Sequence, residues 1–100
     1  MPPPKRSSSR TPRARPARWT LYLLRCADGT LYTGITNALD RRLERYGAGT
    51  ASKYTRSRRP VTLVWSRACR TGRQARVLEY AVKCLSREEK LRLIEGRLRL

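Results

Sequence analysis

The sequence has no histidine, only seven acidic residues and no long apolar run. Without an imidazole, no histidine can act as general base, nucleophile or metal ligand, so proton transfer must use tyrosine, carboxylates, lysine or water. No stretch approaches the roughly 20 apolar residues of a membrane-spanning helix. The cysteines Cys26, Cys69 and Cys84 are odd in number and lack metal-ligand spacing, so we expect no disulfides and free thiols in a reducing cytoplasm.

Acids are few, but basic residues are abundant. Lysine and arginine number 24 in a chain of 100 residues, which gives a net charge of +17. Such a field attracts polyanions and speeds association with them, so DNA or RNA is the expected partner. A chain of this length can build one domain with a single modest core.

Residues 1–18 are predicted to form a disordered basic tail. They hold five of the six prolines, six basic residues and no acid or aromatic residue, so they cannot form a core. The tail is either merely solvated or an arm that contacts phosphates without sequence preference. Its Arg-rich, Ser-rich, acid-free composition also suits an organellar transit peptide, although its prolines oppose the helix that such peptides form. The segment 19–96 is predicted to be the folded domain.

This segment predicts an α+β fold in which a small three-stranded antiparallel sheet is flanked by helices. Two β-rich runs, 20–26 and 31–36, surround the hairpin signal Asp28-Gly29. A helix is expected to begin where Asn37 precedes Asp40 by three residues and to end near Tyr46. The other expected elements are a loop or helical turn at 50–59, a strand at 61–66, a helix at 73–85, and a helix that Ser86 caps and that carries Leu91, Ile94 and Leu98.

The length of the hairpin loop decides where two tyrosines lie. A two-residue turn would place Tyr22 and Tyr32 on opposite faces of the sheet. A three-residue loop that ends at Gly29, in the left-handed region, would instead pair Tyr22 with Gly34 and put both phenols on one face. We predict this second register, with a positive φ at Gly29. Because Gly34 has no side chain, we also expect room for a phosphate or water beside the Tyr22 ring.

Helical spacing singles out one arginine and one glutamate. At about 100° per residue, Arg42 borders the apolar stripe of its helix, whereas Arg41 and Arg45 fall on the solvent side. A guanidinium in that position either snorkels to solvent or meets an anion. Glu79 is the only acid in the helix expected at 73–85 and stands beside its apolar stripe. It either pairs with a basic neighbour or holds a divalent cation, which prefers oxygen ligands.

Together these pieces resemble the GIY-YIG nuclease superfamily, and within it the small stand-alone proteins similar to the structure-specific endonuclease subunit of eukaryotic resolvases. Thr20-Leu21-Tyr22 stands where the family has G-I-Y, and Tyr32-Thr33-Gly34 stands where it has Y-I-G. The resemblance runs from Leu21 to about Ile94. It also rests on the strings Leu31-Tyr32-Thr33-Gly34-Ile35-Thr36, Asp40-Arg41-Arg42, Lys53-Tyr54-Thr55-Arg56, Arg59-Pro60-Val61 and Glu79-Tyr80.

The resemblance implies a metal-dependent endonuclease that hydrolyses phosphodiester bonds in DNA, with structure-specific cleavage as one form of that activity. It makes Tyr22, Tyr32, Arg42 and Tyr46 catalytic, and Glu79 the ligand of one divalent metal ion, Mg²⁺ or Mn²⁺. Either Tyr22 or Tyr32 would orient or deprotonate the attacking water, with Tyr46 assisting. The implied nucleic-acid contacts are Gly34, Lys53, Arg56, Arg58 and Arg59.

The chain also departs from the family pattern. The opening glycine of G-I-Y is absent, Ile35 stands where repair-type members carry a lysine, and a late asparagine of some members has no counterpart. The same fold and charge would also suit a non-catalytic nucleic-acid-binding module or a ribosome-associated basic protein. Pure binding would not need the carboxylate of Glu79, which favours the enzyme. For an enzyme we expect Tyr22, Tyr32, Arg42 and Glu79 to converge on one concave, basic surface.

Overall fold

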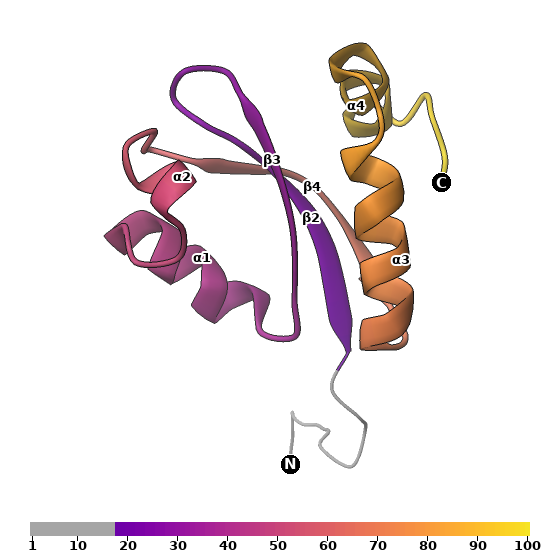
Figure 1. The fold of residues 1–100 in the computed structure, drawn as a ribbon, viewed down its shortest axis with the longest axis horizontal. Coiled ribbons are helices and arrows are strands. Elements are labelled where there is room, and N and C mark those ends of the chain that lie inside the picture. The colour runs from indigo at the N-terminus through magenta and orange to yellow at the C-terminus, as the bar shows by residue number, and fades with distance from the viewer. Residues whose placement is uncertain (1–17) are drawn as a thin grey trace, which may run out of the picture.

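The structure, a computed structural model, describes residues 18–100 and contains a three-stranded antiparallel sheet with helices on both faces (Figure 1). Strand β2 lies in the middle, between β3 and β4. The predicted α+β fold is therefore confirmed, whereas the predicted tail lies outside the described residues except for Arg18. In chain order the elements are β2 (Trp19–Arg25), β3 (Leu31–Thr36), α1 (Leu39–Ala48), α2 (Lys53–Arg56), β4 (Thr62–Cys69), α3 (Gly72–Lys83) and α4 (Arg87–Ile94).

The hairpin of β2 and β3 has the register that a three-residue loop predicts. Tyr22 pairs with Gly34, which lies two residues from Tyr32 on β3. Gly29 ends the loop with a φ of 87°, and its N–H donates to the Cys26 carbonyl at 2.9 Å. Because side chains alternate along a strand, this register puts Tyr22 and Tyr32 on the same face of the sheet.

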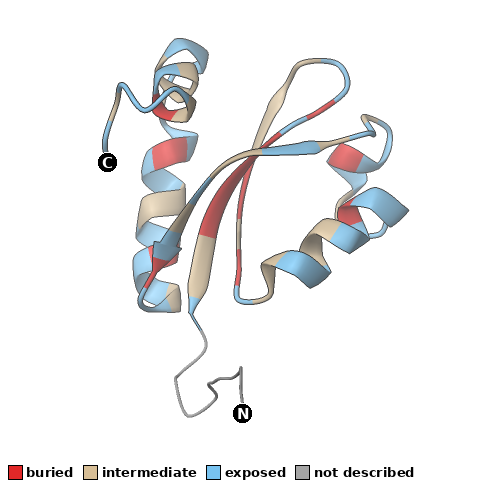
Figure 2. Ribbon diagram, turned by 180° about the vertical axis from the view of Figure 1, so that it is seen from behind, coloured by how far each residue is buried: buried red, intermediate tan, exposed pale blue. Residues whose placement is uncertain are grey.

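Strand β2 is buried on both sides and divides the core into two clusters. The four residues from Leu21 to Leu24 are at most 1% exposed, and Figure 2 shows them as the buried centre of the sheet. Helices α3 and α4 cover one face, while α1 and α2 lie on the other (Figure 1). The first face holds the aliphatic cluster: Leu21, Leu23, Cys69, Ala75, Val82 and Leu93. The second holds the tyrosine cluster: Tyr22, Leu24 and Tyr46, packed against Tyr32, Leu39, Leu43, Ala51 and Val61.

The helix starts were predicted with mixed success. The expected cap at Asn37 is wrong, because α1 begins after Ala38, which offers no capping side chain. The Ala38 N–H instead donates to the Thr36 hydroxyl at 3.1 Å. The capping box of α4 is confirmed, since Ser86 and Glu89 each accept a hydrogen bond from the backbone N–H of the other. A short polar side chain near a helix start therefore caps only when the backbone turns at that residue.

The other element ends also differ from the predictions. Strand β4 continues to Cys69, past the expected end at 66, because β2 pairs with it from Trp19 onwards. Helix α3 ends at Lys83, two residues early. Helix α4 ends at Ile94, so Leu98 packs on the aliphatic cluster from the C-terminal segment and not from a helix.

Two sequence expectations concern the chain as a whole. Of the helices within residues 18–100, none is long and apolar enough to cross a membrane. All three cysteines are free, as expected, with Cys26 and Cys69 buried and Cys84 exposed.

Candidate active site

Three tyrosines from three elements meet in the tyrosine cluster. The hydroxyls of Tyr22 on β2 and Tyr46 on α1 share a hydrogen bond of 2.8 Å. Tyr46 also lies edge-on to Tyr22 and to Tyr32 on β3, with ring centroids 6.0 Å apart in both pairs. Such edge-to-face contacts hold the rings in fixed orientations. Tyr22 is 1% exposed and Tyr46 is 2% exposed, whereas Tyr32 is only half-buried, so Tyr32 is the ring that meets solvent.

Gly34 is required because the Tyr22 ring lies directly across it. A Cβ atom on residue 34 would be 2.6 Å from Cζ and 2.9 Å from Cε1 of Tyr22, too close for nonbonded atoms. The space that the sequence predicted for a phosphate or water is therefore filled by the Tyr22 phenol itself. Gly34 seats Tyr22 in this structure, and its contact with nucleic acid stays a prediction.

Burial sets the protonation of the two inner tyrosines. Burial raises the pKa of Tyr22 above its usual 10.0, although the hydrogen bond with Tyr46 and the positive charge of Arg42 oppose the rise. Burial also raises the pKa of Tyr46, and its hydrogen bond with Tyr22 adds to the rise. Both phenols are therefore protonated at neutral pH, and neither is a general base in this state.

Arg42 on α1 and Glu79 on α3 both lie within electrostatic reach of Tyr22. The Arg42 charge lowers the pKa of Tyr22, and the Glu79 charge raises it. The Arg42 charge also lowers the pKa of Tyr46. Helix α3, which carries Glu79, packs against the edge strand β3 as well as against β2. The structure thus brings together the residues that the resemblance singled out, while their catalytic roles stay predictions.

A small polar pocket lies at the start of α1, beside Arg42. It has a volume of about 160 Å³, and its wall includes Arg41, Arg42 and Arg45. Arg42 is half-buried and the other two arginines are exposed, as helical spacing predicts. One of the Arg45 nitrogens donates to the Thr50 carbonyl at 3.1 Å. Three guanidinium groups around one pocket suit a phosphate group, which accepts charge-assisted hydrogen bonds.

Glu79 is the carboxylate that a metal ion would find here. Its side chain is 22% exposed, and one carboxylate oxygen lies 3.3 Å from the Lys83 ammonium. In the described part of the chain, no three His, Cys, Asp or Glu residues form a group that could hold a metal ion. Mg²⁺ keeps several waters and binds through one or two carboxylates plus substrate phosphates. The residues present therefore fit such an ion once Lys83 releases Glu79.

Tyr54 and Arg58 extend the tyrosine cluster towards the hairpin loop. The Tyr54 ring on α2 stacks on Tyr32, with centroids 5.6 Å apart and an interplanar angle of 22°. The Arg58 guanidinium lies 3.9 Å from the centre of the Tyr54 ring, and its Nε donates to the Asp28 carboxylate at 3.0 Å. Hydrogen bonds from Thr30 and the Arg58 charge lower the pKa of Asp28, which keeps it ionised. Sequence reasoning missed this role of Tyr54, whose only signal was an aromatic residue inside a basic stretch.

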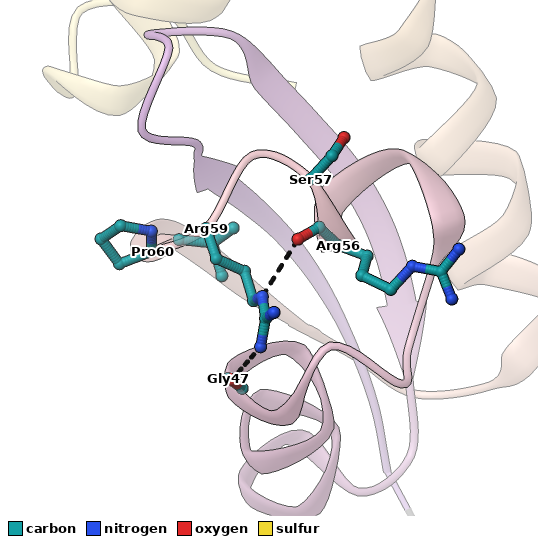
Figure 3. A pocket seen from close by; sticks show the side chains of 6 residues that line it. Gly47, Arg56, Ser57, Arg59 and Pro60 are labelled. Carbon is teal, nitrogen blue, oxygen red and sulfur yellow. Dashed lines mark hydrogen bonds between the residues drawn. The ribbon is translucent and has the colours of Figure 1, made fainter.

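The four basic residues predicted to contact nucleic acid fall into two pairs. Arg58 and Arg59 are engaged within the protein. Arg58 binds the Asp28 carboxylate, and Arg59 donates to the carbonyls of Arg56 and Gly47 at 3.0 Å each (Figure 3). Arg59 thereby links α2 to the end of α1. Lys53 and Arg56 are exposed, and neither forms an ion pair with another residue of 18–100. Figure 3 shows the Arg56 side chain pointing away from Arg59, at the edge of a pocket of about 440 Å³.

Comparison with known proteins defines the class of this domain. The family model described as the GIY-YIG catalytic domain matches residues 18–92. The chain therefore belongs to the GIY-YIG family, whose domains are of the nuclease type and bind nucleic acid.

The chain is also similar to small stand-alone proteins of this family named UPF0213. One from Desulfotalea psychrophila is 49% identical over 83 residues, which cover 82% of this chain and 74% of the relative. One from Staphylococcus haemolyticus is 40% identical over 81 residues, which cover 81% of this chain and 99% of the relative.

Two solution NMR structures show the same fold. A UPF0213 protein from Bacillus halodurans matches with a TM-score of 0.54 and 40% identity, over 80% of this chain and 85% of the other. A protein from E. faecalis matches with a TM-score of 0.57 and 36% identity, over 79% of this chain and 84% of the other. These likenesses confirm the three-stranded α+β architecture.

Proposed function

We propose that this protein is a divalent-metal-dependent endonuclease that hydrolyses phosphodiester bonds in DNA. The observation that carries the proposal is that Arg42, in the wall of the polar pocket at the start of α1, and the partly buried Glu79 of α3 flank the sheet that carries the tyrosine cluster. A pure binding surface would need arginines but no carboxylate at this position. Membership of the GIY-YIG family and a net charge of +17 support the same function.

Arg42 and Glu79 divide the work on the scissile phosphate. Arg42 binds a non-bridging oxygen and offsets the negative charge that grows in the transition state. Glu79 would hold the metal ion, Mg²⁺ or Mn²⁺, which when bound would stabilise charge on the phosphate and on the leaving oxygen. The Lys83 ammonium, 3.3 Å from a Glu79 oxygen, would have to move aside for such an ion.

Tyr32 is the tyrosine that orients the attacking water. Water must reach the phenol that orients it, and Tyr32 is half-buried while Tyr22 and Tyr46 are almost fully covered. The two inner phenols stay protonated, bond to each other and give Tyr32 a rigid support. Their part in catalysis is therefore to position Tyr32 within reach of the phosphate.

The test is a cleavage assay with the full-length protein and labelled linear and branched DNAs, in Mg²⁺ or Mn²⁺. We expect the wild type to cut and Glu79→Gln to be inactive with unchanged DNA affinity, because the amide removes a metal ligand without adding charge repulsion. The control is Glu95→Gln, which removes an exposed acid at the end of α4 and should cut normally. Parallel loss of binding and cleavage in Glu79→Gln would contradict the metal role.

One observation favours a second function, that of a non-catalytic nucleic-acid-binding module. The Glu79 carboxylate already has a cationic partner in Lys83, at 3.3 Å, so it is satisfied without a metal ion. The same assay separates the two functions. A binding module would bind every DNA tightly and cut none of them in either metal.

A further inference from the structure

A second basic pocket lies beside Tyr54. It has a volume of about 240 Å³ and is formed where the end of the hairpin loop approaches the first turn of α4. Two cations and no acid line it. The lining residues are Thr30, Leu31, Tyr54, Arg87 and Lys90.

The first turn of α4 leaves both cations of this pocket available. Arg87 and Lys90 are three residues apart in the helix, so their side chains are neighbours on one face. Glu89, an acid of the same turn, is turned to the backbone, where its carboxylate accepts a hydrogen bond from the Ser86 N–H at 2.9 Å. No residue between 18 and 100 forms an ion pair with Arg87 or Lys90.

The acid of the hairpin loop is not available to these cations either. Asp28 is 3.0 Å from Arg58 and also accepts hydrogen bonds from Thr30. Its charge is therefore offset locally, and the pocket keeps the two positive charges of its own wall. Such a site favours an anion, and the fork of an arginine beside the point charge of a lysine suits phosphate oxygens.

Tyr54 connects this pocket to the candidate active site. Tyr54 is 41% exposed and contributes to the pocket wall. Its ring stacks on the Tyr32 ring, with centroids 5.6 Å apart. Arg42 acts on Tyr22 and Tyr46, at the other end of the row of tyrosines. The row thus has Arg42, the proposed ligand of the scissile phosphate, near one end and this pocket at the other.

Another pocket with two cations in its wall provides a contrast. It is lined by Arg67 and Arg99 together with Trp65, Leu93 and Leu98 of the aliphatic side. No acidic residue lines it and neither arginine is in an ion pair in the described part of the chain, but none of the tyrosines is part of its wall. Charge alone therefore does not distinguish the two pockets, whereas proximity to Tyr32 does.

We infer that Arg87 and Lys90 bind a backbone phosphate of the strand that is cut, away from the scissile phosphate. The inference rests on the proposed function for the identity of that strand. Contacts of this kind fix the position of a strand and do not read its sequence. The pocket and the Arg42 site together hold the strand at both ends of the tyrosine row.

The test measures DNA affinity against salt with the full-length protein, in the Glu79→Gln background and without metal, so that no cleavage occurs. The double variant Arg87→Gln/Lys90→Gln should flatten the plot of log affinity against log salt by about 0.7–0.9 for each phosphate that the protein no longer neutralises. The matched control Arg67→Gln/Arg99→Gln removes the same charge from the other pocket and should change the slope less. The exchange Arg87→Lys/Lys90→Arg keeps the charge and should restore the slope.

Equal slope changes in the two double variants would overturn the inference, because the effect would then come from net charge alone. Thermal melts followed by circular dichroism test whether each variant is folded. If Arg87→Gln/Lys90→Gln is not folded, the two single variants are measured in its place. If the slope changes only in Arg87→Gln/Lys90→Gln and the wild type never cuts DNA, the phosphate site is supported and the proposed nuclease function is wrong. If cleavage depends on Glu79 but the two double variants have equal slopes, the nuclease function is supported and the phosphate site is wrong.

Discussion

The two faces of the sheet differ in chemistry although the same strand, β2, supplies both. On the face of α3 and α4, Leu21 and Leu23 meet aliphatic side chains, and burial there serves stability. On the face of α1, Tyr22 meets Tyr46, so the same depth of burial encloses two hydroxyl groups that must bond to each other. A polar core layer is costly to build, and here it lies where Arg42 and Glu79 approach. The comparison therefore assigns most of the stability to the aliphatic face and the tyrosines with Arg42 to the other face, while α3 contributes Glu79 from the aliphatic side.

The largest expected effect is on the aliphatic face. Leu23→Ala removes a fully buried side chain and should lower the free energy of unfolding by about 2–5 kcal/mol. Denaturant unfolding measures this change. DNA cleavage per folded molecule, measured at low temperature, should stay at the wild-type level, and its loss in folded protein would show that the two faces are not separable.

Gly34→Ala tests the tyrosine face. The added methyl group would meet the Tyr22 ring, so the ring must move and its bond to Tyr46 must break or bend. We expect a loss of about 1–3 kcal/mol in the free energy of unfolding, as for other overpacked cores. The control is Gly47→Ala in α1, where a Cβ meets nothing within 4 Å and should stabilise by about 0.5–1 kcal/mol. Equal stability of the two variants would contradict the seating role of Gly34.

The parts of this arrangement that follow from local chemistry could be predicted. The pleat of a strand and the left-handed position of Gly29 together fix which face Tyr22 and Tyr32 share. Helical spacing likewise places Arg42 beside the core. These rules use only neighbours in sequence, and the structure agrees with them.

The parts that depend on distant residues could not be predicted. The basic run at 53–59 gives no sign that Arg59 binds the Gly47 carbonyl of α1, twelve residues away. The missing side chain of Gly34 suggests open space, but the ring of its cross-strand partner Tyr22 occupies it. The cap at Asn37 failed because the Thr36 hydroxyl bonds to the backbone first. For Arg59 and Gly34 a tertiary contact decided between options that were equal locally, whereas at Asn37 two neighbouring polar side chains competed and the pattern could not rank them.

Alkaline pH should destabilise the protein through the two buried phenols of the tyrosine face. The pKa values of Tyr22 and Tyr46 are raised above 10.0 in the folded state, so above that pH the phenols ionise first in the unfolded chain. Stability is then fully present below pH 10 and falls as the pH rises further, by at most about 1.4 kcal/mol per pH unit for each phenol. The variant Tyr22→Phe/Tyr46→Phe should remove this pH dependence of the free energy of unfolding. Denaturant unfolding between pH 9 and 11, about one unit on either side of the usual phenol pKa, measures it.

The control for the alkaline experiment is Tyr80→Phe, which removes a largely exposed phenol. At neutral pH the double variant should be nearly as stable as the wild type, because both partners of the buried hydrogen bond are removed together. A steep alkaline loss that persists in the double variant would assign the titration to other groups.

The smallest effect on stability, with a larger one on rate, is expected for Arg58→Lys. Lysine keeps the charge but cannot lie flat over Tyr54 while it also binds Asp28, as the guanidinium does. The free energy of unfolding should fall by only about 0.5–1 kcal/mol, the usual value of an exposed cation–π contact. Because Tyr54 supports Tyr32, the loosened ring should lower kcat by up to about 10²-fold, with KM unchanged.

Arg56→Lys is the matched control, since it changes an exposed arginine two residues away whose guanidinium is in no ion pair with residues 18–100. The ring signals of Tyr32 in NMR spectra should broaden or shift in Arg58→Lys and stay unchanged in Arg56→Lys. If KM rises and kcat does not change, Arg58 contacts the substrate directly and does not act through Tyr54. If neither constant changes while the Tyr32 signals do, the position of that ring does not limit catalysis, and the tyrosine face would have to be assigned a structural role like that of the aliphatic face.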